Sequence, residues 1–343
     1  MMKNPAIPAQ DISEAEADAR LRQSHFDIGA LLAKADHRFT ADDHRAANSF
    51  YTAAAQYIGQ NDVMAAQHAA DAQRATAMIE YCGQLFRQHL NDYLDNAGFT
   101  KSNRHPRFQK SLEMMLGESE RPPTNQAFPQ TPLVYYYPDL PYVDFADPVD
   151  FPWRGKLEEQ YPAMRREAEA LLAHGADFKP YIKTTEERPQ GDVHGMLENP
   201  DWSTLYLWEN GAAVDDHVKL CPTIFEAVME NAPLCHIGPR APSVMLSLLR
   251  PGAHIPPHTG MLNCRYICHL PLIIPGGCGF RVGERRVEWE EGEMLMFDDT
   301  VQHEAWNKGD ENRVVLIIDI WRPELDDAER EQVTALFAAV DSY

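Results

Sequence analysis

The fold is decided by the stretch from residue 243 to residue 321, which begins with "SVMLSLL" (residues 243–249) and ends with "RVVLIIDIW" (residues 313–321). Further runs rich in β-branched, aromatic and other apolar residues lie between them: "RYICHLPLII", "GFRV", "RRVEWE" and "EMLMF". Turn-forming segments such as "PGG" and "EEGE" separate these runs. Upstream, "LVYYYPDLPYVDF" (residues 133–145) is also aromatic and β-prone. Several short strands with frequent turns, preceded by helices, are typical of a jelly roll or barrel flanked by helices.

The segments around the β-rich stretch have helical patterns, so the expected fold class is α+β. Residues 1–117 are alanine-rich with apolar residues at helical spacing, and they form either a tetratricopeptide-like repeat or a plain helical bundle. Residues 118–132 are polar and proline-rich and are the best candidate for a linker. A jelly-roll domain is then expected over residues 133–343, with one amphipathic helix ending at Gly175 and a closing helix whose apolar face contains Val333, Leu336, Phe337 and Val340.

The composition argues against several classes of protein. With 52 acidic and 31 basic side chains the formal net charge is −21, and a field of that sign repels phosphate backbones, so nucleic acid is not an expected partner. The sequence contains neither a run of about 18 apolar residues nor a signal-peptide pattern near its start, so no membrane span is expected. Its six cysteines form no CxxC pair, which favours reduced, buried thiols and a cytoplasmic location.

Two histidines and one arginine in the β-rich stretch suggest a metal site beside an anion site. His258 closes one predicted strand segment, and His303 follows the apolar run "EMLMF". A jelly roll puts such segments side by side, with side chains alternating inward. Arg313 opens the last predicted strand, where a buried guanidinium needs an anion and its planar fork suits a carboxylate. A metal with an anionic co-substrate beside it would account for all three residues.

Longer matches, in the same order along the chain, point to one family. The segments "SLLRPGAHIPPHTG", "NCRYICHLPLIIP", "WEEGEMLMFDDTVQHEAWN" and "RVVLIIDIWRPEL" closely resemble the aspartyl/asparaginyl β-hydroxylase family of iron(II)- and 2-oxoglutarate-dependent oxygenases. The resemblance extends over roughly residues 133–325 and is densest from residue 243 onward. It implies a double-stranded β-helix (a cupin-like jelly roll) as the oxygenase domain. It also implies a reaction that uses Fe(II), 2-oxoglutarate and O2.

The resemblance implies an unusual iron site. Most oxygenases of this superfamily bind iron with two histidines and one carboxylate. This family is similar but has glycine in place of the carboxylate, as at Gly260. The resemblance therefore implies that His258 and His303 are the catalytic, iron-binding pair, with water completing the coordination shell. A tight turn is another reason for a glycine at this position, and the two explanations are compatible.

The resemblance also implies how the co-substrate is bound. Arg313 is expected to pair with the distal carboxylate of 2-oxoglutarate, and His269 is expected to be a further contact. Ser247 falls at a hydroxyl position in the same pocket, although an ordinary strand serine is an equal alternative. This chain departs from better-known members at Ile267, where they have a second basic residue. Arg265 could replace that contact, but a salt-bridged structural role is the better expectation for it.

Other polar and aromatic residues near these motifs are expected to have supporting roles. His254 is expected at the pocket wall and not on the metal. The acids of "FDD", Asp298 and Asp299, are expected in a turn that orients the second histidine. Trp202 and Trp208 are expected in the core and not against the substrate.

These roles predict hydroxylation of a C–H bond. Within the family, the expected target is the β-carbon of an Asp or Asn side chain in a peptide, a protein or an amino-acid-like molecule. One alternative is a halogenase, because chloride can occupy an iron position that lacks a carboxylate. Another is a non-catalytic, cupin-like scaffold that acts through its helices. The sequence leaves open the substrate itself, the oligomeric state and whether the helical region presents a peptide.

Overall fold

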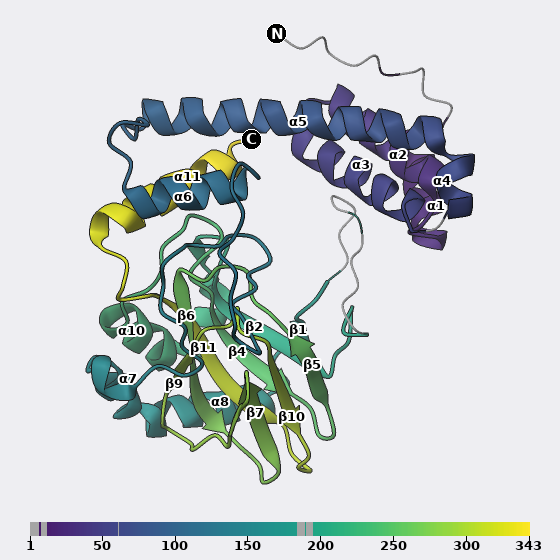
Figure 1. Ribbon diagram of the computed structural model, residues 1–343. Coiled ribbons are helices and arrows are strands. Elements are labelled where there is room, and N and C mark those ends of the chain that lie inside the picture. Colours follow the sequence, from purple (N-terminus) through teal and green to yellow (C-terminus); the bar gives the residue numbers. More distant parts are fainter. Residues whose placement is uncertain (1–6, 8–11, 61, 184–188, 190–194) are drawn as a thin grey trace. The chain divides into compact units, whose positions relative to one another are not determined.

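The structure is a computed structural model that describes residue 7, residues 12–60, residues 62–183, residue 189 and residues 195–343 (Figure 1). Its described residues divide into two compact units. Unit 1 contains the chain up to Thr100 together with Ala339–Tyr343, and unit 2 contains Lys101–Lys183 and the chain from residue 195 to Ala338. The predicted boundaries at residues 117 and 132 stay a prediction. They differ from this division in that residues 101–132 belong to unit 2.

Unit 1 is built from antiparallel helices. They are α1 (Glu14–Gln23), α2 (Ile28–Thr40), α3 (His44–Ile58), α4 (Asp62–Gln67) and α5 (Ala69–Asn96). Their shared core contains Leu31, Phe50, Ile58 and Met78, all fully buried. The helical character of this region is as the alanine-rich spacing predicts, whereas a tetratricopeptide-like repeat stays a prediction.

Unit 2 combines helices with two antiparallel sheets. Its helices are α6 (Pro106–Met115), the 3₁₀ turn η1 (Pro148–Asp150), α7 (Arg154–Glu158), α8 (Tyr161–Ala173), α9 (Asp215–Val218), α10 (Pro222–Asn231) and most of α11 (Asp327–Asp341). The predicted helix ending at Gly175 is in fact two, α7 and α8. Gly175 has a positive φ of 65° just beyond the end of α8, as a helix-terminating glycine does.

The major sheet has the strand order β1-β2-β4-β11-β6-β9, with β3 paired to β2. These strands are β1 (Lys179–Pro180), β2 (Trp202–Glu209), β3 (Ala212–Ala213), β4 (Val244–Leu249), β6 (Arg265–Ile273), β9 (Leu295–Phe297) and β11 (Arg313–Trp321). The minor sheet has the order β5-β10-β7-β8, formed by β5 (His254–His258), β7 (Cys278–Val282), β8 (Arg285–Val287) and β10 (His303–Asn307). The two sheets form the jelly roll that the sequence predicts.

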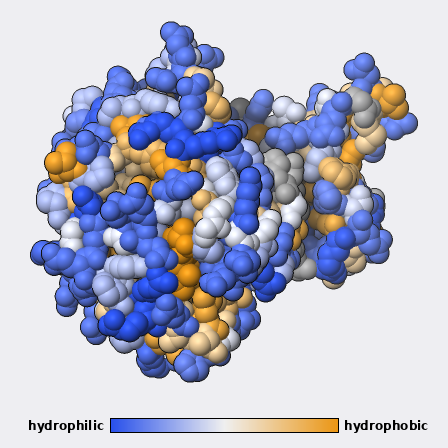
Figure 2. Space-filling model, turned by 90° about the horizontal axis from the view of Figure 1, so that it is seen from below, coloured by the Kyte–Doolittle hydropathy of each residue, from blue (hydrophilic) through white to orange (hydrophobic). Residues whose placement is uncertain are grey.

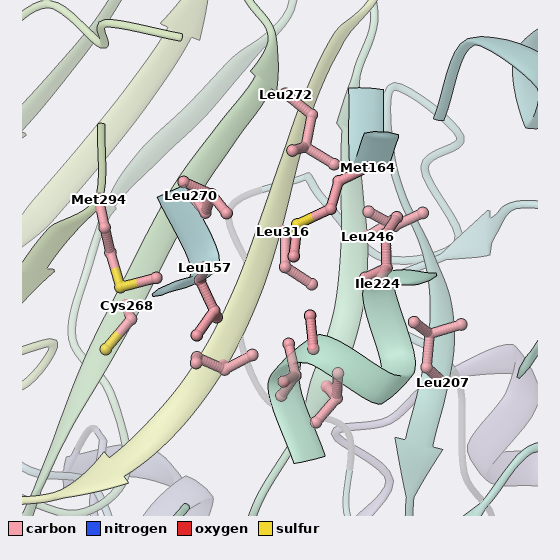
Figure 3. Packing of buried hydrophobic residues seen from close by; sticks show 14 of the residues in the cluster. Leu157, Met164, Leu207, Ile224, Leu246, Cys268, Leu270, Leu272, Met294 and Leu316 are labelled. Atoms are coloured by element: carbon pink, nitrogen blue, oxygen red, sulfur yellow. The ribbon is translucent and has the colours of Figure 1, made fainter. Parts of the chain in front are cut away.

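The outer face of the major sheet is closed by helices. Leu316 of β11 pairs in register with Leu246 of β4 and Leu270 of β6, and all three are fully buried. Figure 3 shows this row of leucines against Met164 of α8 and Ile224 of α10. Complete burial of each such side chain stabilises the fold by about 2 kcal/mol. The helices therefore fix the major sheet from outside and leave its other face directed toward the minor sheet.

Side chains alternate along β11, so the strand serves two environments. Val314, Leu316, Ile318 and Ile320 belong to the helix-covered core. Val315 and Ile317 belong to a second core that includes residues of the minor sheet such as Phe280 and Val282. Arg313 and Asp319 share the phase of this inner group and are both buried. The inside of the jelly roll is thus apolar in its middle and charged toward both ends of β11.

Two expectations change or gain detail in the structure. The β-prone segment 133–145 forms isolated bridges, at Tyr135 and Phe145, and no regular strand. Pro138 and Pro141 interrupt it, and a proline has no N–H to donate to a sheet. All six cysteines are free and buried, including Cys221 and Cys235.

The visible surface is largely polar. The face in Figure 2 is mostly hydrophilic, with hydrophobic residues confined to scattered clusters. Among the residues that the structure describes, every helix is too short or too polar to cross a bilayer.

Candidate metal and co-substrate site

His258 and His303 lie opposite each other on neighbouring strands of the minor sheet. They are direct register partners across the antiparallel pair β5 and β10, and the register shifts next to them, with one extra residue on β5 between Ile255 and His258. Their ring centroids are 4.1 Å apart, and the ring planes make an angle of 54°. The two imidazoles that the sequence singles out are therefore close enough for both to reach one ion.

Both rings are held in one orientation by the backbone. Nδ1 of His258 lies 2.8 Å from the carbonyl oxygen of Pro256, and Nδ1 of His303 lies 3.0 Å from that of Val301. A carbonyl only accepts hydrogen bonds, so each Nδ1 carries the proton and the metal-binding lone pair is on Nε2. Burial, and then the neighbouring His258, lower the pKa of His303 well below its usual value. Neutral imidazole is the form that binds a metal ion.

Gly260 leaves no room for a third ligand from its own position. Its backbone N–H donates to the carbonyl oxygen of Asp299 at 2.6 Å. A Cβ on residue 260 would overlap the carboxylate of Asp299, which packs against the Cα. The φ of Gly260 is not positive, so the glycine is needed for space and not for a special turn conformation. Asp299 thus brings a carboxylate beside the position from which a third ligand would project, a feature that the sequence does not reveal.

The second part of the site surrounds Arg313. This side chain is only 1% exposed, and in the described chain it pairs with no carboxylate. Its Nη2 donates to Ser247 Oγ at 3.2 Å, while Nε and Nη1 have no hydrogen-bond partner among the described residues. The ring of Trp289 lies 4.8 Å from its Cζ. Burial lowers the pKa of Arg313 to about 10, which leaves it a cation at neutral pH. A buried cation with unused donors is what an anionic ligand needs.

His269 lies between this arginine and the histidine pair. Its ring is 5.2 Å from Phe280 and 4.9 Å from Phe297, and each of these rings also contacts His303. Burial, followed by the charges of Arg313 and His303, lowers the pKa of His269 well below its usual value. Its Nδ1 is buried without a hydrogen-bond partner in the described chain. His269 is therefore a neutral imidazole with one unused nitrogen, near both parts of the site.

Trp202 connects the two parts and is more than a core residue. Its indole N–H donates to Ser247 Oγ at 3.3 Å, on the same oxygen that Arg313 uses. Its ring also lies 5.8 Å from that of His258. The strand position of Trp202 predicts burial but not this bridging contact, which only the pairing of β2 with β4 creates. Trp208 packs on the outer core, as expected.

A third group of charges lies beside Asp299. Arg265 donates to Asp319 at 2.5 Å and to Asp299 at 3.3 Å, so it has the salt-bridged role that the sequence favours. Burial raises the pKa of Asp299 to about 7, against the opposing effect of Arg265. Ile267, the register partner of Asp319, is buried and adds no charge.

Two supporting residues differ from expectation. His254 is not at the pocket wall: it is half exposed and pairs with Glu304 at 2.8 Å. The register shift between Ile255 and His258 explains this, because strict alternation along β5 would place His254 and His258 on the same face. Asp298 does not contact either histidine. It is fully buried and binds Arg322 at 3.0 Å, Gln130 and Thr300, so it fixes the turn before β10.

Within the described ranges, one set of three potential ligands has donor atoms close enough for an ion: His105, Asp326 and Glu329. Glu329, however, is already engaged. Arg107 donates to both of its oxygens at 2.7 Å, and the Tyr137 hydroxyl donates to it at 2.8 Å. These bonds join α6 to α11, and we interpret the cluster as structural.

Comparisons with known proteins agree on one family. The family described as Aspartyl/Asparaginyl beta-hydroxylase matches residues 158–323, which include every residue of the candidate site. The ornithine lipid ester-linked acyl 2-hydroxylase of Rhizobium tropici is 33% identical over 180 residues, 52% of this chain and 60% of that protein. The human aspartyl/asparaginyl beta-hydroxylase is 37% identical over 145 residues, 41% of this chain and 18% of that protein. The chain thus spans less than two thirds of these relatives.

A relative in Xenopus tropicalis, aspartate beta-hydroxylase domain-containing protein 2, is 30% identical over 65% of this chain and 59% of that protein. Among solved structures, a Pseudomonas putida prolyl-4-hydroxylase matches with 14% identity and a TM-score of 0.29, over 50% of this chain and 98% of that one. The family assignment rests on the sequence matches. The part of this chain from residue 158 to residue 323 belongs to the aspartyl/asparaginyl β-hydroxylase family.

Proposed function

We propose that unit 2 is an Fe(II)- and 2-oxoglutarate-dependent dioxygenase that hydroxylates a C–H bond. The environment of Arg313 is the main support for this proposal. Arg313 is a buried cation that no carboxylate of the described chain balances, and Ser247 and Trp202 link it to the histidine pair. A dicarboxylate that binds Arg313 at one end and a metal at the other would satisfy both parts of the site at once.

The proposed roles follow from the donor atoms. His258 and His303 hold Fe(II) through Nε2, because the backbone carbonyls of Pro256 and Val301 fix the Nδ1 protons. Arg313 and the Ser247 hydroxyl bind the distal carboxylate of 2-oxoglutarate. The iron, when bound with 2-oxoglutarate and O2, supplies the oxidising power for hydroxylation.

The surrounding residues shape the environment of that chemistry. Neutral His269 offers one nitrogen to the co-substrate without adding charge. Phe280, Phe297 and Trp289 pack around it and exclude water. A dry, apolar enclosure strengthens the charge-assisted bonds at Arg313 relative to the same bonds in water.

The substrate is proposed only by class. The expected target from the family is the β-carbon of an Asp or Asn side chain in a peptide, a protein or an amino-acid-like molecule. The relatives are named for two kinds of target, aspartyl or asparaginyl residues in one and an ester-linked acyl chain of ornithine lipid in another. Participation of unit 1 in substrate binding and a cytoplasmic location stay predictions.

Asp299 argues against the halogenase alternative. A halide on the iron would replace the missing carboxylate near Gly260, and the Asp299 carboxylate already lies there. The space for a halide beside Gly260 is therefore already filled. The scaffold alternative gives no reason for a buried cation such as Arg313 to have two donor atoms without a partner in the described chain.

The test is an anaerobic visible spectrum of the full chain with Fe(II) and then with 2-oxoglutarate. We expect a charge-transfer band only when both are present, lost in His303→Ala and weakened in Arg313→Ala. His254→Ala is the matched control, because this histidine is on the same strand as His258 but pairs outward with Glu304. It should keep the band.

Absence of the band in folded wild-type protein would overturn the proposal. So would a band that His254→Ala and His303→Ala weaken equally, because the histidine pair would then have no special role.

A further inference from the structure

Resting on the function proposed above, we propose that the site selects a substrate whose reacting carbon bears no carboxylate, and that Asp319 enforces this choice by neutralising Arg265. The favoured substrate is an uncharged aliphatic group, from either an acyl chain or an amino-acid side chain. Trp202, Tyr181 and Asp299 connect the histidine pair to Arg265.

These residues form a closed circuit of contacts. From His258 the circuit passes to the ring of Trp202 at 5.8 Å and from there to the ring of Tyr181 at 4.3 Å. Tyr181 is near enough to Arg265 and Asp299 for their charges to act on its hydroxyl group. Asp299 then packs against Gly260, two residues from His258.

The circuit reaches solvent on one side. Tyr181 is 37% exposed, whereas Arg265, Asp299 and Trp202 are buried. A substrate that approaches the histidine pair from this side would meet the ring of Tyr181, with the charges around Arg265 close behind it. We call Arg265, Asp299 and Asp319 the entrance triad.

The entrance triad has a net charge of −1 when both acids are ionised. Among the described residues, Arg265 is the one basic side chain that pairs with either carboxylate. Asp319 is the nearer partner, at 2.5 Å, and its other contact is the backbone N–H of Ser243 at 3.1 Å. Asp299 Oδ1 has no hydrogen-bond partner in the described chain. The arginine is thus fully compensated and offers no free charge to an incoming anion.

A carboxylate on the substrate would meet an unfavourable environment here. It would lose its hydration and gain no free cation, because Arg265 already pairs with Asp319 and Asp299. Ile267 stands beside Asp319 in register and contributes only an aliphatic surface. A second basic residue would be needed to balance the triad and bind an acidic substrate.

The surface beside Gly260 is also apolar. Leu133 and Met261 are 69% and 49% exposed, and the backbone N–H of Leu133 donates to the carbonyl of Gly260 at 2.9 Å. Val134 beside them is 39% exposed and its N–H donates to the carbonyl of Met261. This apolar rim is continuous with Gly260 and offers a favourable surface to an aliphatic group.

The experiment compares probes that differ only in the reacting group. They are one heptapeptide with norvaline, asparagine or aspartate at its centre, and N-decanoylglycinamide as the acyl probe. Binding to the full chain loaded with Fe(II) and 2-oxoglutarate is followed without oxygen by the change in the charge-transfer band, and product by succinate release in air. The comparison of acyl and peptide probes identifies the source of the group.

The expected result is binding of at least one uncharged probe about tenfold or more tighter than the aspartate peptide, since a like charge in such a site is costly. Asp319→Asn keeps an oxygen that can accept from Ser243 but removes one of the two carboxylates that pair with Arg265. It should therefore reduce the preference for the uncharged probe over the aspartate peptide by about tenfold. Asp310→Asn, at an exposed aspartate, makes the same change in net charge and should leave the ratio unaltered.

Three results would overturn the inference. The aspartate peptide could bind as tightly as the uncharged probes, Asp319→Asn could behave like Asp310→Asn, or no probe could perturb the band in either protein. In each case the band itself remains, so the proposed function survives. Loss of the band in wild-type protein would instead remove the proposed function.

Discussion

Arg313 and Arg322 lie at the two ends of β11, and both are fully buried, yet their surroundings are opposite. Arg322 binds Asp298 at 3.0 Å, Glu324 at 2.9 Å and the carbonyl oxygen of Pro141 at 2.8 Å. Arg313 has one hydroxyl and one aromatic ring. Burial lowers the pKa of both, but in Arg322 the hydrogen bond and charge of its partners outweigh it and raise the pKa above its usual value.

The difference in partners distinguishes a structural role for Arg322 from the proposed ligand-binding role of Arg313. A buried arginine whose donors are satisfied within the chain holds the fold together, as Arg322 does for the turn at Asp298 and the chain at Pro141. A buried arginine with unused donors costs stability and is retained only if something else binds it. The same comparison applies to neighbouring acids, because Asp298 is paired within the fold and Asp299 lies beside Gly260.

The largest expected effect on stability comes from replacing Arg322, whose donors have partners within the chain. Arg322→Met leaves Asp298 buried without its cation, and breaking such a pair costs about 3–5 kcal/mol. Denaturant unfolding should show this loss with and without 2-oxoglutarate. Arg285→Met is the control, since that exposed arginine pairs with Asp144 and should cost at most about 1 kcal/mol. Equal losses in both variants would break the comparison.

A smaller loss is expected at the carboxylate pair. Gly260→Asp forces its Cβ into the Asp299 carboxylate, and such overpacking costs about 1–3 kcal/mol. Adding Asp299→Gly should recover most of this loss in thermal unfolding, because the overlap is removed. Strictly additive effects of the two substitutions would show that Asp299 does not occupy the space of residue 260.

Ser247→Ala tests the proposed ligand-binding role of Arg313. It removes the oxygen that Arg313 and Trp202 share, and one hydrogen bond is worth about 1 kcal/mol. Calorimetry should therefore show 2-oxoglutarate binding weakened about fivefold. Ser203→Ala is the control. Ser203 follows Trp202 on β2, and its hydroxyl donates to the carbonyl of Pro200, so its loss should leave 2-oxoglutarate binding unchanged. An equal effect of both would assign Ser247 a structural role.

The smallest effect on stability is expected from replacing Arg313. The folded-state pKa of Arg313 is lowered to about 10, so the charged form destabilises the fold at every pH below that value and the penalty is relieved as pH rises through it. In protein without ligand, Arg313→Met should therefore leave the free energy of unfolding unchanged or raise it by about 1 kcal/mol. A loss as large as that of Arg322→Met would contradict the account.

Much of the fold can be predicted from periodicity. Strands β4, β6 and β11 are long apolar runs, and the apolar face of α11 (Val333, Leu336, Phe337 and Val340) is fully buried. Strand β5 is harder to predict because its sequence "HIPPH" has two prolines, which cannot donate to a sheet. The segment 133–145 has strand composition, but its prolines prevent a regular strand.

The site is only partly readable from the sequence, because its contacts join distant segments. The residue types of His258, His303 and Arg313 signal a metal and an anion, whereas the overlap of Asp299 with Gly260 depends on a separation of 39 positions along the chain. The outward direction of His254 depends on the register shift within β5, because strict alternation would place it on the same face as His258. Trp202 reads as a core residue because its hydrogen bond to Ser247 arises only from strand pairing.

The most direct test of the account is the affinity for 2-oxoglutarate, measured by calorimetry without oxygen, in wild-type protein and in Arg313→Met with Mn(II) in place of Fe(II). We predict saturable binding to the wild type and a loss of about 2–5 kcal/mol in Arg313→Met, the cost of removing one partner of a buried charge pair. Unchanged affinity in the variant would mean that 2-oxoglutarate is not the anion that balances Arg313.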